Sequence, residues 1–203
     1  VTVYLEHEGQ IVQIEFLNES VYTNVSIGKS GYTEVVPGQE IRYTFKDIAN
    51  NSTVPLDSFY WRDTLPTDAV RLDKIITGTY SARLNYKVVF QTNLNDTQRV
   101  LADNLNTQKN YTLDASPAAL GLASNEYVTQ VTFLFGRVPG GFKQVETPYI
   151  YCDVLSSLSH EYRFANKCDV GGMWQNQWVQ ATDRWVTIIY RGGPVPTLPR
   201  TGY

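Results

Sequence analysis

The sequence has few of the residues on which catalysis and metal binding usually depend. Its 203 residues include two cysteines and two histidines, and their spacing fits no metal-ligand pattern. It also lacks a Gly-x-Ser-x-Gly elbow, a His-Glu-x-x-His helix motif and a phosphate-binding glycine loop. These absences argue against a hydrolase or a metalloenzyme, and we expect neither enzymatic activity nor a cofactor or metal.

Positive charge and long apolar runs are also scarce. The chain has 17 Lys and Arg against 20 Asp and Glu, a net charge of -3, and no basic cluster. An extended nucleic-acid surface is therefore not expected. No window approaches the roughly 20 apolar residues that a membrane-spanning helix needs. With 42% hydrophobic residues, the chain can form a globular core, and we expect a monomer in solution.

Abundant residues favour strands and turns. There are 14 tyrosines, and threonine, valine and asparagine are frequent, which is typical of β-structure. Apolar residues at 12, 14 and 16 alternate with polar ones, the period of a half-buried strand. The sequence predicts an all-β fold. Strands are expected over residues 2–6, 11–17 and 25–29, then a loop, a turn at Pro37-Gly38 and a strand that ends at Phe45. Further strands are expected over 59–66, 70–76, 84–91, 127–135, 149–155, 162–165, 178–181 and 185–190.

One long stretch interrupts this rhythm. Residues 92–126 are rich in Asn, Asp, Thr and Gln, so they are predicted to be an irregular insert with a short helix or turn over 116–122. Asn93, Asn95, Asp96 and Asp103 supply oxygen ligands there. They lack the ordered spacing of a calcium loop, so turn formation is the expected role.

The end of the chain is a proline-rich arm. Pro194, Pro196 and Pro199 follow Gly192-Gly193 and favour an extended, solvated segment. The arm contains Leu198, Pro199, Arg200, Thr201 and Gly202. This pentapeptide has the form Leu-Pro-any-Thr-Gly and resembles the sorting signal of Gram-positive cell-wall-anchored proteins.

The resemblance implies a specific partner. A sortase would cleave between Thr201 and Gly202 and join the Thr201 carbonyl to an amine of cell-wall peptidoglycan or of a pilus subunit. Such signals normally continue into an apolar span and a basic tail, which this sequence does not contain. We therefore expect the sequence to be an ectodomain piece of a longer chain, located outside the cell and covalently attached to the wall.

A second resemblance covers the start of the main body. The segments Pro-Gly-Gln-Glu-Ile-Arg-Tyr-Thr-Phe (37–45), Ile-Ala-Asn-Asn-Ser (48–52) and Asp-Thr-Leu-Pro (63–66) are similar to a conserved repeat domain of bacterial surface proteins, an Ig-like β-sandwich. Residues 164–170 resemble its closing strand. The resemblance implies one enlarged Ig-like sandwich over 23–191, followed by a linker and sorting motif over 192–203.

Residues 1–22 are predicted to form a hairpin. It resembles the closing strands of the collagen-adhesin B-type repeat, and so could be the remnant of a preceding module. The alternative, which we favour because an isolated hairpin is only marginally stable, is that it begins the sandwich itself.

Two covalent links are candidates. Cys152 and Cys168 could close a disulfide in an exported chain, or could remain buried free thiols. Domains of this kind also form isopeptide bonds, for which Lys29 and Asn166 are the expected partners and Asp47 or Asp63 the expected acid. Burial would keep the amine neutral and the acid protonated. The plainer interpretation is an exposed Lys29 and a turn-forming Asn166.

Tryptophans provide a candidate ligand surface. Trp174, Trp178 and Trp185 lie close together in the sequence and could stack on sugars, although such residues often fill the core instead. The expected function is a structural stalk, an adhesin or a pilin-like subunit that contacts a host or microbial glycan or protein. The alternative is a carbohydrate-binding accessory module of a cell-surface glycosidase.

Overall fold

The structure is a computed structural model and describes residues 2–15 and 20–190. The predicted sorting motif at 198–202 lies outside these residues. The described residues form strands and no helix, so the all-β prediction is confirmed. In chain order the strands are β1 (Thr2–His7), β2 (Gln10–Glu15), β3 (Val25–Ser30), β4 (Glu34–Val35), β5 (Glu40–Asn50), β6 (Leu56–Thr64), β7 (Val70–Ile76), β8 (Thr79–Tyr80), β9 (Asn85–Thr92), β10 (Arg99–Asn106), β11 (Thr112–Asp114), β12 (Val128–Val138), β13 (Gln144–Glu146), β14 (Tyr149–Val154), β15 (Arg163–Trp174) and β16 (Gln177–Ile189).

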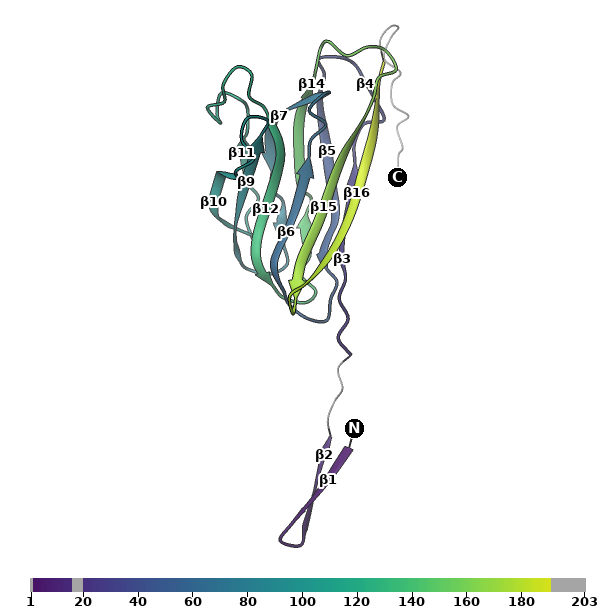
Figure 1. Cartoon of the computed structure of the whole chain (residues 1–203), viewed down its shortest axis with the longest axis vertical. Coiled ribbons are helices and arrows are strands. Elements are labelled where there is room, and N and C mark those ends of the chain that lie inside the picture. The colour runs from purple at the N-terminus through teal and green to yellow at the C-terminus, as the bar shows by residue number, and fades with distance from the viewer. Residues whose placement is uncertain (1, 16–19, 191–203) are drawn as a thin grey trace.

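Two sheets make a β-sandwich (Figure 1). One has seven strands in the order β10-β9-β12-β6-β15-β16-β4, and the other has five in the order β11-β7-β14-β5-β3. Neighbouring strands are antiparallel except β4, which pairs parallel to β16. A further small sheet pairs β8 with β13. Because the sheets are open rather than closed into a barrel, their inner faces must cover each other.

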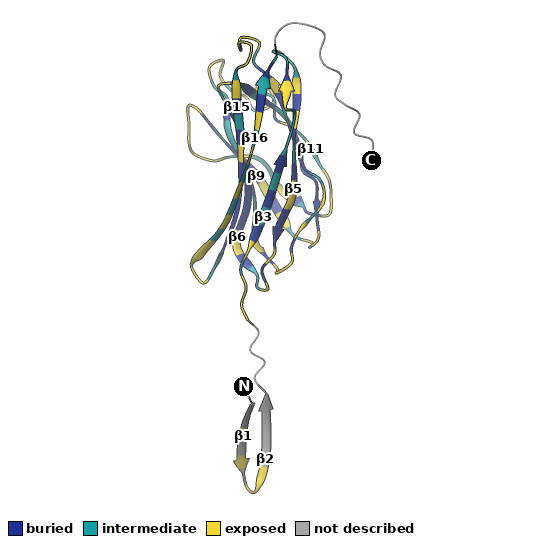
Figure 2. Ribbon diagram, turned by 90° about the vertical axis from the view of Figure 1, so that its right-hand side faces the viewer, coloured by how far each residue is buried: buried dark blue, intermediate teal, exposed yellow. Residues whose placement is uncertain are grey.

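The core forms where the inward rows of the two sheets meet (Figure 2). On β3, β7 and β14, buried residues alternate with more exposed ones, as a sheet with one buried face requires. Trp61 lies at the centre, stacked on Phe133 with ring centroids 3.9 Å apart. Its indole nitrogen donates a hydrogen bond to the Tyr80 hydroxyl at 2.9 Å. The central aromatic group therefore has its polar atom satisfied.

Strands β15 and β16 form one long hairpin, which the sequence did not predict. Short strands were expected at 162–165, 178–181 and 185–190, whereas pairing runs from Arg163↔Ile188 to Trp174↔Gln177 without interruption. The turn consists of Gln175 and Asn176, both with positive φ. Positive φ at both central residues is the condition for a tight turn whose twist matches the flanking strands.

The insert over 92–126 is also more regular than predicted. It contains β10, which pairs with β9, and β11, which pairs with β7. Residues 117–121 form a turn rather than a helix. Two register shifts interrupt β10, and bulges of this kind break the alternation that identifies a strand in sequence.

The N-terminal hairpin is a sheet of its own. β1 and β2 pair with each other from Thr2↔Glu15 to His7↔Gln10 and pair with no strand of the sandwich. Within residues 2–15 and 20–190, no helix is long and apolar enough to cross a membrane.

Candidate functional site

Three polar residues occupy inward positions that the strand pattern reserves for apolar side chains. Lys29 continues the row Val25, Ile27 on β3, and Asp63 continues the row Phe59, Trp61 on β6. Asn166 follows Phe164 on β15 in the same way. All three are buried. The strand geometry therefore directs an amine, a carboxyl and a carboxamide into the sandwich core.

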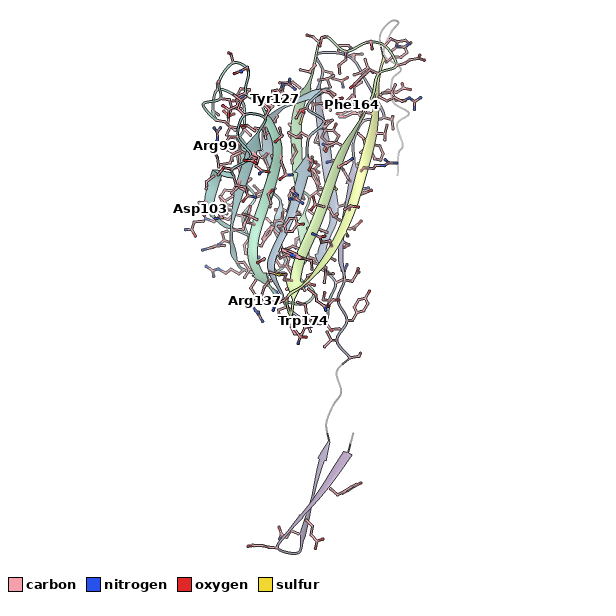
Figure 3. The ribbon with its side chains drawn as sticks, viewed as in Figure 1. Arg99, Asp103, Tyr127, Arg137, Phe164 and Trp174 are labelled. Atoms are coloured by element: carbon pink, nitrogen blue, oxygen red, sulfur yellow. The ribbon has the colours of Figure 1, made fainter. Side chains whose placement is uncertain are left out.

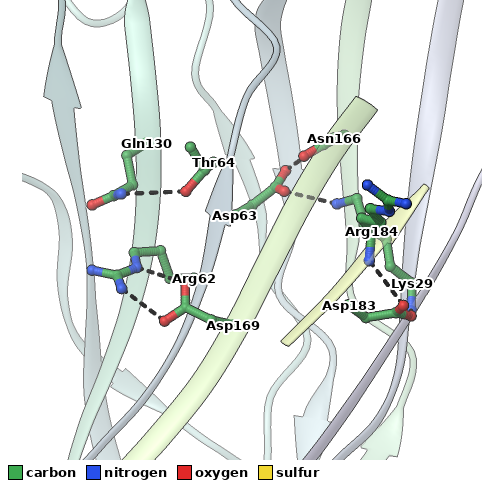
Figure 4. Close-up of polar contacts among 9 residues, drawn as sticks. All are labelled: Lys29, Arg62, Asp63, Thr64, Gln130, Asn166, Asp169, Asp183 and Arg184. Carbon is green, nitrogen blue, oxygen red and sulfur yellow. Dashed lines mark hydrogen bonds and ion pairs between the residues drawn. The ribbon is translucent and has the colours of Figure 1, made fainter. Parts of the chain in front are cut away.

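These three side chains meet (Figure 4). Lys29 Nζ donates to Asp63 Oδ1 at 2.7 Å, and Asn166 Nδ2 donates to Asp63 Oδ2 at 3.2 Å. The side chains of Lys29 and Asp63 are both 0% exposed. β6 and β15 are neighbours in the seven-stranded sheet, whereas β3 belongs to the facing sheet. Lys29 thus reaches across the sandwich to a carboxyl already held beside Asn166. We call these three residues the buried triad.

The surroundings of the triad are apolar. Lys29 Nζ lies 3.9 Å from the ring centroid of Phe45 and 4.6 Å from that of Tyr43. Burial raises the pKa of the Asp63 carboxyl, while the charge and hydrogen bond of Lys29 and the hydrogen bond from Asn166 oppose the rise. In such a site an ammonium–carboxylate ion pair is little more stable than the neutral amine and carboxylic acid, because both charges have lost their hydration. A neutral amine beside a carboxamide is a competent nucleophile.

Asp47 lies outside the buried triad. Counting by twos from Tyr43 and Phe45 would place it inward on β5. Instead Asp47 adopts a positive φ of 56° and is exposed, while the next residue, Ile48, is buried. A register shift in the β3–β5 pairing accompanies this change. Such a local irregularity reverses the direction of the side chain.

The predicted disulfide does not form in the structure. Cys152 and Cys168 are both buried free thiols. Cys152 belongs to β14 of the five-stranded sheet and Cys168 to β15 of the seven-stranded sheet. Burial raises the pKa of Cys168 to about 12, which also makes its thiol unreactive.

The three candidate tryptophans do not share a surface. In the hairpin, Trp185 is directly opposite the buried Asn166 and Trp178 is opposite Met173, so the two point to opposite faces. Trp174 and Trp185 pack against the core, and Figure 3 shows Trp174 at one end of the sandwich. Trp178 is 52% exposed on the outer face, edge-on to Tyr60. The predicted sugar-stacking platform of three rings is therefore not assembled.

The oxygen-rich residues of the insert hold its loops. Asn93 accepts a hydrogen bond from the Tyr127 backbone and donates to the Asn125 carbonyl, and Asn95 accepts from the Thr97 backbone. Within the described residues, no group of three or more His, Cys, Asp or Glu side chains could hold a metal ion.

Comparisons with known proteins give distant similarities of fold. No known protein family matches the sequence, and no curated protein matches it. Among solved structures, the chain is similar to AvmM, which catalyses macrocyclization in alchivemycin A biosynthesis. The identity is 9% and the TM-score 0.33, over 96% of this chain and 99% of that chain.

Two surface proteins are also similar in structure. One is a putative membrane-anchored protein from Corynebacterium diphtheriae, with 14% identity and a TM-score of 0.42, over 91% of this chain and 39% of that chain. The other is a collagen-binding domain from a Staphylococcus aureus adhesin, with 10% identity and a TM-score of 0.34, over 84% and 99%. Similarities this distant assign no function to the chain.

Proposed function

We propose that this chain is the ectodomain of a wall-anchored surface protein, acting as a structural stalk, an adhesin or a pilin-like subunit. Its sandwich is locked by an intramolecular isopeptide bond between Lys29 and Asn166. The bond forms once in each molecule, so the domain is not a turnover enzyme. A sortase then joins the chain through Thr201 to cell-wall peptidoglycan or to a pilus subunit. The wall-anchored role and the sortase step rest on the Leu-Pro-Arg-Thr-Gly sequence and its resemblance to sorting signals.

The buried triad is the observation that carries the proposed bond. Burying a lysine completely lowers the stability of the fold unless a well-matched partner compensates for its lost hydration. Lys29 has an acid at 2.7 Å, and the same acid holds Asn166 through its other oxygen. Folding therefore places the nucleophile Lys29, the proton carrier Asp63 and the electrophile Asn166 together, so the reaction itself loses little further entropy in aligning them.

Intact mass tests the bond directly. We expect the purified chain to weigh about 17 Da less than its sequence requires, because amide exchange releases one ammonia. Asp63→Asn removes the proton carrier and should show the full sequence mass. Asp47→Asn is the matched control, since it changes the other candidate acid and should retain the deficit. A wild-type chain at full sequence mass would refute the isopeptide bond.

A transpeptidation assay tests the sorting step. Incubated with a purified sortase and an oligoglycine acceptor, the chain should lose Gly202-Tyr203 and gain the acceptor at Thr201. Thr201→Ala should prevent the reaction, whereas Asn166→Ala, within the sandwich, should not. The product is identified by intact mass and peptide mapping. Equal joining of wild type and Thr201→Ala would show that this motif is not the site.

A further inference from the structure

Two buried polar atoms have no hydrogen-bond partner among the described residues in this part of the core: Oδ1 of Asn166, a member of the buried triad, and the hydroxyl oxygen of Tyr43. Tyr43 is 1% exposed and Asn166 0% exposed. Buried polar atoms are nearly always paired, so each exception requires an explanation. Here one atom belongs to a hydroxyl that can donate, and the other is a carbonyl oxygen that can accept.

The two residues lie in the same compartment. Lys29 Nζ is 4.6 Å from the Tyr43 ring centroid and shares Asp63 with Asn166. Burial raises the pKa of Tyr43, and the nearby Cys152 and Asp63 raise it further. The side chains of Asn166 and Thr187 are near enough to oppose the rise. The phenol therefore stays protonated and keeps its hydrogen available to donate.

The two carboxylate oxygens of Asp63 contact different nitrogens of the proposed reaction. Oδ1 contacts the attacking nitrogen of Lys29, and Oδ2 contacts Nδ2 of Asn166, the nitrogen that must leave. Asp63 is thus placed to carry protons from one nitrogen to the other. In this arrangement it makes no hydrogen bond to the Asn166 carbonyl oxygen, the atom on which negative charge develops during attack. That oxygen needs a different donor.

We propose that Tyr43 is a catalytic residue of the cross-linking reaction, donating a hydrogen bond to Asn166 Oδ1 as this oxygen becomes an oxyanion. The inference rests on the proposed isopeptide bond. Lys29 first transfers a proton to Asp63, and its neutral amine attacks Cγ of Asn166. Asp63 gives its proton to Nδ2 and takes another from Nζ. The carbonyl re-forms, the bond from Cγ to Nδ2 breaks and ammonia leaves, with Asp63 left neutral.

Tyr43→Phe tests the inference, because it removes only the hydroxyl. The full chain is synthesised in a cell-free system, quenched in acidic denaturant at intervals, and the fraction lighter by one ammonia is measured by intact mass. Loss of one oxyanion donor typically slows a reaction by about 100-fold or more, so we expect that slowing. Tyr86→Phe is the matched control: its buried hydroxyl also has no hydrogen-bond partner within residues 2–15 and 20–190, but it lies in the aromatic cluster with Tyr80 and Phe135. Its rate should equal that of wild type.

A folding defect is separated from a catalytic one in the Lys29→Ala background, where no bond can form. There, Tyr43→Phe should leave the thermal midpoint unchanged if the hydroxyl acts only in the reaction, and a loss of several degrees would indicate a structural role and overturn the inference. Equal cross-linking rates for wild type and Tyr43→Phe would overturn the role of Tyr43 while leaving the bond established. A wild-type chain that never loses ammonia would overturn both.

Discussion

Asn166→Ala is expected to lower the thermal midpoint of the sandwich by roughly 10–20 °C. A bond between Lys29 and Asn166 closes a loop of about 138 residues in the unfolded chain, worth about 5 kcal/mol in the chain-entropy treatment used for disulfides. For a domain of this size each kcal/mol corresponds to about 2–4 °C. The substitution leaves the ion pair of Lys29 and Asp63 in place, so it does not strand a buried charge. Differential scanning calorimetry of both proteins gives the shift.

Truncating a buried side chain also lowers stability by itself, even where no bond is lost. A double-mutant cycle separates this packing effect from the loss of the bond. In the Asp63→Asn background, where no bond forms, Asn166→Ala should cost much less than in wild type. The denaturant dependence provides a second readout. A cross-linked unfolded chain is more compact, so wild type should show a smaller m-value than Asn166→Ala. If Asn166→Ala cost the same in both backgrounds, the stabilisation would be ordinary packing.

The strand pattern explains why much of the triad could be expected from the sequence. Lys29 and Asp63 stand in phase with apolar neighbours two and four residues away, and a charged residue in such a row is either buried with a partner or marks a break in the strand. The resemblance to a surface-protein repeat suggested Lys29 and Asn166. The choice between Asp47 and Asp63 stayed open because both fit the alternation. The positive φ at Asp47, which no periodicity reveals, keeps its side chain out of the core, so the proposed bond uses Asp63.

For other features the sequence pattern is misleading or gives no indication at all. The sequence predicts only fragments of the β15–β16 hairpin because Gly171 and Gly172 interrupt β15, and glycine usually weakens a strand. In the structure a Cβ on Gly171 would lie 3.0 Å from the Tyr60 ring, so glycine allows the outer-face tyrosine to lie against the strand. Tyr43 looks like an ordinary core aromatic residue between Ile41 and Phe45. The proposed role of its hydroxyl depends on its position beside Asn166 in the fold.

Under mechanical load, the proposed bond should prevent most of the sandwich from extending. The chain enters the sandwich at β3 and leaves it at the end of β16, and these points lie at opposite ends of the body (Figure 1). Tension would pass along β3 to Lys29, cross to Asn166 and continue through β15 and β16. Residues 30–165 lie outside this path. Without the bond, tension instead separates the strands until the whole chain is extended.

Single-molecule force spectroscopy can measure this difference. About 136 residues are shielded by the bond, and at 3.3–3.6 Å per extended residue they correspond to roughly 450–490 Å of contour length. Asn166→Ala, placed between marker domains of known unfolding length, should release this additional length in its unfolding event. The wild-type sandwich should extend by no more than about 100 Å, from residues 25–28 of β3 and residues 167–189 of β15 and β16. Because contour length counts residues rather than energies, destabilised packing cannot mimic the result. A wild-type sandwich that extends as far as the variant would exclude a covalent link between β3 and β15.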